Sequence, residues 1–195
     1  MNPSFVVALL FLAMPAFTQN KSAAVEGPCL KYTYTKGSSQ TPDYRFDKHF
    51  DLDKEGRSFS CGPQVRPSEV RRALERFRNG VLYHSVTDVN AVVRFPIVVH
   101  VFQSLEVNAK SEDITVHNSD EWFALQKEHF SKLHLAMIAC AHLGNVSAMS
   151  GRSPGVMIGD GLFWFQASSG NPKVRLTVVN LYPVNKDSLV DACTP

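Results

Sequence analysis

The stretch Ser150-Gly151-Arg152-Ser153-Pro154-Gly155 is a polar turn that leads into the apolar run Leu162-Phe163-Trp164-Phe165. Glycine and proline interrupt regular structure in this way between strands. A second alternating run, from Val174 to Tyr182, follows a segment rich in serine, glycine and proline. Together the two runs predict a β-hairpin formed by 162–166 and 174–182.

Helical patterns precede this hairpin. An apolar stripe at helical spacing predicts a helix over Pro67–Asn79, with Asn79-Gly80 as its stop signal. The run from Asp120 to Leu143 has neither glycine nor proline, and Asn118 or Ser119 can cap its first turn. It predicts a second helix.

The remaining segments predict strands. Ala91 to Phe102 is apolar and β-branched, which favours a central strand, although Pro96 favours an end, an edge or a bulge. Strand alternation would place Arg94, Pro96, Val98 and His100 on one face. Short alternating runs within 31–61 predict a β-hairpin region. The order of elements predicts an α+β fold, with one main helix packed on a twisted, mostly antiparallel sheet.

The N-terminal segment 1–18 is predicted to be a secretory signal peptide, because an apolar core is followed by small and polar residues. Segment 19–28 is expected to be a flexible leader, and 29–195 a single domain. No later segment is long and apolar enough to predict a membrane span, so we expect a secreted protein without membrane partners. The net charge of +2 does not by itself indicate a nucleic-acid binder.

The four cysteines, Cys29, Cys61, Cys140 and Cys193, all follow the predicted signal peptide. An even count in a secreted chain predicts two disulfides, and three pairings are open. We favour Cys61–Cys193, because it would tie the start of the domain to its end and its long loop would restrict the unfolded chain strongly in the entropic model. Cys29–Cys140 then follows by elimination. The alternative for Cys140 is a buried free thiol in an apolar helix.

Several motifs in a shared order resemble the fungal guanyl-specific ribonuclease and ribotoxin superfamily. They are Cys61-Gly62 before a helix, Arg94-Phe95-Pro96-Ile97, Gly151-Arg152-Ser153-Pro154-Gly155 and Asp191-Ala192-Cys193-Thr194. The ribonuclease-like secreted effectors of plant-infecting fungi are the most similar subset, with Phe59-Ser60-Cys61 as their aromatic-x-Cys element. Relative to this family, 103–149 is expected to be an extra helical insertion. The resemblance implies a microbial ribonuclease-like fold and delivery into host cells as a virulence factor.

The family's chemistry uses a glutamate base, a histidine acid and an arginine on the phosphate, and a Tyr-Pro-His element assists. At these positions the chain has Arg94 for the base and Asn180 for the acid, while Tyr83-His84 only loosely matches the assisting element. Arginine cannot accept a proton at ordinary pH, and asparagine has none to give. The resemblance therefore implies a pseudoenzyme that binds RNA or a host protein.

Two kinds of side chain are candidates for RNA contacts: arginines, which can bind phosphates, and aromatic rings, which can stack on bases. The candidates are Arg71, Arg72, Arg76, Arg94, Arg152, Tyr83 and Trp164. The alternative for the helix arginines is a solvated outer face, and for the two aromatic residues it is packing in the core.

Two other functions are considered. An active endoribonuclease with a rebuilt site would use His84 and His100 as base and acid, with Arg94 on the phosphate. An unrelated disulfide-stapled module would bind protein, with the 122–143 helix as its partner surface. The spacing of His129, His134 and His142 does not favour a metal site, and we expect no cofactor and a monomer.

Overall fold

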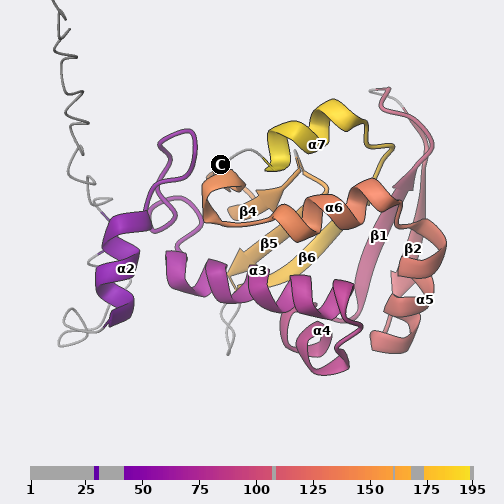
Figure 1. The fold of residues 1–195 in the computed structure, drawn as a ribbon, viewed down its shortest axis with the longest axis horizontal. Coiled ribbons are helices and arrows are strands. Elements are labelled where there is room, and N and C mark those ends of the chain that lie inside the picture. Colours follow the sequence, from indigo (N-terminus) through magenta and orange to yellow (C-terminus); the bar gives the residue numbers. More distant parts are fainter. Residues whose placement is uncertain (1–28, 31–41, 107–108, 160, 168–173, 194–195) are drawn as a thin grey trace, which may run out of the picture.

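The computed structural model describes residues 29–30, 42–106, 109–159, 161–167 and 174–193. These residues form a six-stranded sheet with helices packed against one face (Figure 1). The predicted α+β class is confirmed. The predicted signal peptide (1–18) and the expected leader (19–28) lie outside the described residues.

The strand order in the sheet is β2-β1-β6-β5-β4-β3. The strands are β1 (Ile97–Phe102), β2 (Ser111–Val116), β3 (Ser147–Met149), β4 (Gly155–Ile158), β5 (Phe163–Ala167) and β6 (Val174–Leu181). The predicted hairpin is confirmed, because β5 and β6 pair antiparallel. However, β1 and β6 pair parallel, so the sheet is mixed rather than wholly antiparallel. The helices and antiparallel strands between β1 and β6 return the chain in the direction of β1.

The described helices are α2 (Pro42–Phe50), α3 (Pro67–Leu82), α4 (Val86–Val92), α5 (Ser119–His129), α6 (Lys132–Cys140) and α7 (Lys186–Cys193). A short 3-10 turn, η2, covers Leu143–Asn145. Each helix packs on a neighbour in one layer: α2, α4 and α6 contact α3, α5 contacts α4, and α7 contacts α6. The sequence predicts one main helix on the sheet, whereas the structure has a layer of several helices around it.

The predicted main helix is α3, and Pro67 occupies its first turn. The expected stop at Asn79-Gly80 is wrong, because the helix continues to Leu82. A Cβ on Gly80 would lie 2.7 Å from Cγ2 of Val89 in α4. Gly80 therefore serves the close approach of two helices rather than the end of one.

Two segments that the sequence assigns to strands contain helical residues. In the expected hairpin region, Tyr44-Arg45-Phe46 belongs to α2, while the run at 32–34 lies outside the described residues. The rings of Phe46 and Phe50, four residues apart, lie 4.6 Å from each other, which is a helical contact. In the expected strand Ala91–Phe102, α4 occupies the first residues, and β1 starts only at Ile97, after the cis peptide bond Phe95-Pro96.

The predicted helix Asp120–Leu143 is two helices. Asn118 caps α5 by accepting hydrogen bonds from the backbone N–H groups of Asp120 and Glu121, both at 3.0 Å. Phe130 is extended, and the Ser131 hydroxyl then caps α6 by accepting from the backbone N–H of His134. The expected insertion 103–149 is also not purely helical, because it contains β2 and β3.

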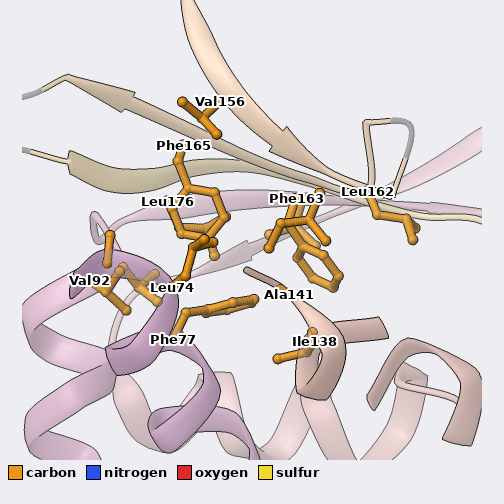
Figure 2. Packing of buried hydrophobic residues seen from close by; sticks show 14 of the residues in the cluster. Leu74, Phe77, Val92, Ile138, Ala141, Val156, Leu162, Phe163, Phe165 and Leu176 are labelled. Atoms are coloured by element: carbon orange, nitrogen blue, oxygen red, sulfur yellow. The ribbon is translucent and has the colours of Figure 1, made fainter. Parts of the chain in front are cut away.

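The core lies between α3 and the inner face of the sheet (Figure 2). The ring of Phe77 in α3 lies 5.1 Å from that of Phe163 and 5.4 Å from that of Phe165, both on β5. Trp122 of α5 meets Phe77 edge-on at 6.2 Å. Aromatic contacts of this kind stabilise a core beyond the burial of their area.

The disulfides correct the favoured pairing. Cys29 pairs with Cys61, and Cys140 pairs with Cys193, so Cys61–Cys193 and Cys29–Cys140 are both wrong. Loop length does not decide pairing, since a bridge needs two cysteines whose Cα atoms lie within about 7 Å. The end of α7 lies against the end of α6, and Cys140 is therefore bonded rather than a free thiol.

Candidate functional site

The outer face of the sheet is the surface on which the sequence-based candidates meet. Along β1, Ile97 and Val99 are buried in the core, whereas Val98 is 40% exposed and His100 is half-buried. The described helices pack on the other face. We call the surface formed by the alternate residues the open face: Val98, His100, Phe102, Asp113, Thr115, Met157, Trp164, Gln166, Arg175, Thr177, Val178 and Asn180.

A histidine–carboxylate pair lies at one side of the open face. Nδ1 of His100 lies 2.7 Å from Oδ1 of Asp113, its partner across the β1–β2 pair. The hydroxyl of Ser111 donates to the same oxygen at 3.2 Å. The hydrogen bond from His100 is the main cause that lowers the pKa of Asp113. A carboxylate at Nδ1 leaves Nε2 of the neutral imidazole as the acceptor.

Asn180 lies beside this pair. It is the parallel partner of His100 on β6, so the two side chains are neighbours on the open face. Its amide nitrogen donates to the backbone carbonyl of Gly161 at 2.7 Å, which fixes the orientation of the amide. The structure therefore brings together two residues that the sequence singled out for different reasons. The sequence did not single out Asp113 as a candidate. The signal that could have found it is the alternation along 111–116, which places Asp113 and Thr115 on the same face.

Aromatic and basic side chains continue the open face across the sheet. Trp164 on β5 pairs with Val178, and Gln166 pairs with Arg175 of β6. The indole of Trp164 packs over Gly155, where a Cβ would collide with it. This explains why the Ser-Pro-Gly turn ends in glycine. Trp164 is half-buried on the outer face rather than part of the core.

Arg94 reaches the sheet just before β1. Its backbone N–H donates to the carbonyl of Leu176 at 3.1 Å, and Val93 forms an isolated parallel bridge with the same residue. The side chain of Arg94 is exposed. Val98 and His100 share the outer face of β1, as the alternation predicts, whereas Arg94 and Pro96 precede the strand and are exposed.

Tyr83 and His84 lie at the end of α3, in the helical layer. Tyr83 is 75% exposed, so it does not pack in the core. The His84 ring lies 5.2 Å from that of Phe123 in α5. The open face carries His100, and the structure does not bring His84 to it.

The helix arginines belong to the helical layer, and two of them, Arg71 and Arg72, have partners there. Arg71 lies over the ring of Phe46 at 4.5 Å, and its Nε is 3.9 Å from Glu75. Arg72 forms an ion pair with Asp43 at 3.3 Å. Arg76 lies on the same helix, half-buried. Arg152 lies exposed in the turn before β4, apart from all three.

Histidine does not form a metal centre in the described part of the chain, where no group of three or more His, Cys, Asp or Glu residues is placed to hold an ion. His134 is buried instead. Its Nε2 donates to the carbonyl of Tyr182 at 3.0 Å, and its Nδ1 accepts from the backbone N–H of Ser131. Burial lowers the pKa of His134 and favours the neutral ring.

Buried carboxylates near α2 organise the chain before α3. Burial raises the pKa of Asp51, which accepts hydrogen bonds from Ser58 and Ser60. Burial also acts to raise the pKa of Asp53, but donors from Ala148, Arg57 and Glu55 outweigh it and lower the pKa. These hydrogen bonds hold loop 51–58 in place.

Comparisons with known proteins identify no relative: no family model, curated protein or solved structure matches the chain. Among the described residues, no helix combines the length and apolar character that crossing a bilayer requires.

Proposed function

We propose that this chain is a secreted, ribonuclease-like effector that does not turn over substrate and binds single-stranded RNA on its open face. The observation that carries the proposal is the row of cross-strand neighbours Asp113, His100 and Asn180 beside the aromatic side chains Phe102 and Trp164. Single-stranded RNA is bound on sheet surfaces by rings that stack on bases and by side chains that hydrogen-bond to base edges.

The absence of turnover follows from the proton-transfer groups. Cleavage by attack of the 2′-hydroxyl needs both a base and an acid, each typically worth about 10²–10⁴-fold in rate. Within the described residues, the open face carries one imidazole, and its neighbour Asn180 cannot titrate. The guanidinium of Arg94 is always protonated at ordinary pH, so it cannot accept a proton from the 2′-hydroxyl.

Secretion and the effector role rest on sequence. The apolar segment at the N-terminus is typical of a signal peptide, and two disulfides are compatible with an oxidising compartment. The effector role and delivery into host cells follow from the family resemblance. A host protein on the open face is the competing partner, and the binding assay separates the two.

The test is binding of the purified protein to a fluorescently labelled, single-stranded RNA, followed by anisotropy at several salt concentrations. We expect affinity that falls with salt, by about 0.7 log units per log unit for each phosphate contact. Phe102→Ser should weaken binding about fivefold or more, since stacking on one base is worth about 1–3 kcal/mol. Arg72→Gln, on the helical layer, is the matched control and should bind like the parent protein. Binding that Phe102→Ser leaves unchanged would refute the proposal.

One observation favours a second function, an active endoribonuclease. The His100–Asp113 pair is the arrangement in which a carboxylate orients a catalytic imidazole. Incubation with structured RNA and analysis for cyclic-phosphate ends decides between the two. We expect no cleavage; specific cleavage that is abolished by His100→Ala would establish the enzyme and overturn the proposal.

A further inference from the structure

A groove lies in the helical layer, away from the open face. It has a volume of about 590 Å³ and runs between α2, α3 and the segment that follows α6. Its apolar lining comes from Phe46, Phe50, Leu52, Leu74 and Leu143. Phe50 and Leu52 are each 40% exposed, although most large apolar side chains of the described residues are buried. The volume lies within the range of sites for small molecules, about 300–1,000 Å³.

Arg78 lines the groove and has no anionic partner among the described residues. Nη2 of Arg78 donates to the carbonyl of Ala141, while Nε is buried and has no hydrogen-bond partner among the described residues. No described carboxylate lies within ion-pair distance of this guanidinium. A buried, unsatisfied donor on a charged group is costly, and most buried polar groups in proteins have a hydrogen-bond partner, either protein or ordered water.

The other charged side chains around the groove do not neutralise Arg78, so an external anion can. Lys54 and His142 also line it. Of the two lining carboxylates, Asp53 accepts hydrogen bonds from Arg57, Glu55 and Ala148. Glu75 lies 3.9 Å from the guanidinium of Arg71. Both carboxylates thus have positive or donor partners already, whereas Arg78 has no carboxylate partner among the described residues.

We propose that this groove binds a small anionic amphiphile, a carboxylate on an unbranched alkyl chain, with its head on Arg78 and its chain along Phe46, Phe50 and Leu74. A planar guanidinium binds a carboxylate through parallel N–H donors. Arg78 lines the groove and is half-buried, and the only partner of its guanidinium among the described residues is the Ala141 carbonyl at Nη2, so the partly exposed end of the guanidinium can receive the carboxylate. The apolar walls suit an alkyl chain, which would cover the exposed Phe50 and Leu52. The site is independent of RNA binding, because it belongs to the helical layer.

The experiment is isothermal titration calorimetry of the full-length secreted protein with decanoate. Two further ligands separate the contributions: 1-decanol keeps the chain without the charge, and acetate keeps the charge without the chain. We expect saturable one-to-one binding of decanoate, with 1-decanol at least about tenfold weaker, as befits the loss of a charged hydrogen bond. Equal affinity for decanoate and 1-decanol, or no binding of decanoate, would overturn the proposal.

Variants locate the site. Arg78→Met should weaken decanoate at least about tenfold and leave 1-decanol unchanged. Phe50→Ser should weaken both ligands, and its partly exposed position should leave the fold intact. Arg76→Met, on the same helix but outside the groove lining, is the matched control. Thermal unfolding of each variant identifies loss of folding. If Phe50→Ser folds and binds decanoate like the parent protein, or if only an acidic, apolar peptide binds, the amphiphile site is refuted.

Discussion

Asp47 of α2 caps a helix to which it does not belong. Its Oδ1 accepts a hydrogen bond from the backbone N–H of Ser68 at 2.5 Å, and its Oδ2 accepts one from the Ser68 hydroxyl at 3.0 Å. Ser68 lies in the first turn of α3, where backbone N–H groups have no partner within the helix. Asp47 is fully buried, so the contact joins α2 firmly to the main helix.

Replacing this carboxylate should therefore destabilise the fold. We expect Asp47→Ala to lower the free energy of unfolding by about 1–3 kcal/mol, because it leaves two buried donors unsatisfied. Urea denaturation followed by circular dichroism measures the change. Asp43→Ala, which removes an exposed ion pair from the same helix, should cost less than about 1 kcal/mol. Similar losses for both variants would contradict the capping role.

Gly80 should not tolerate a side chain, although it lies inside a helix. Alanine is favoured over glycine by about 1 kcal/mol in a helix interior. Here the added Cβ would meet Val89 at 2.7 Å, and we expect Gly80→Ala to destabilise the protein by about 1–3 kcal/mol. Asn79→Ala, one residue earlier and exposed, is the control and should be neutral or slightly stabilising. A stabilised Gly80→Ala protein would show that α3 and α4 do not pack this closely.

His134 should make stability depend on pH. Burial holds the folded-state pKa of His134 below its ordinary value of 6.5, so the unfolded chain binds a proton more readily. The stabilisation is present above pH 6.5 and is lost as the pH falls through the lower, folded-state pKa. We expect His134→Gln to reduce the slope of unfolding free energy against pH in this window. A slope that His134→Gln leaves unchanged would contradict this role of His134.

The disulfide pairing predicts the products of proteolysis without reduction. Mass spectrometry should find Cys29 linked to Cys61 and Cys140 linked to Cys193. The Cys140–Cys193 bridge spans 53 residues, and in the chain-entropy model its loss costs about 4 kcal/mol. Denaturation of the Cys140→Ser, Cys193→Ser double variant measures this cost. Peptides that join Cys61 to Cys193 would contradict the fold.

Sequence patterns predicted the elements that carry strong local signals. The stripe of Val70, Leu74 and Phe77 predicted α3, and the alternating runs on either side of 167–173 predicted β5 and β6. Alternation also predicted that Val98 and His100 share a face. These features depend on neighbours within a few residues, and the period of burial reports them directly.

Tertiary contacts decided the rest. Tyr44-Arg45-Phe46 suits a strand or a helix equally, and the packing of Phe46 and Asp47 on α3 selects the helix. The stop expected at Gly80 was wrong because α4 packs there. The meeting of His100 with Asp113 and Asn180 required the pairing of three strands, two of them about 80 residues apart in sequence.

The sequence by itself thus determined the α+β class, the main helix, the C-terminal hairpin and the residue types available for chemistry. The tertiary structure alone decided the disulfide pairing, the parallel neighbour of β1, the open face and the groove at Arg78. The physical reason is that strand pairing, bridges and cavities join residues distant in sequence, whereas periodicity and capping signals describe only local backbone preference.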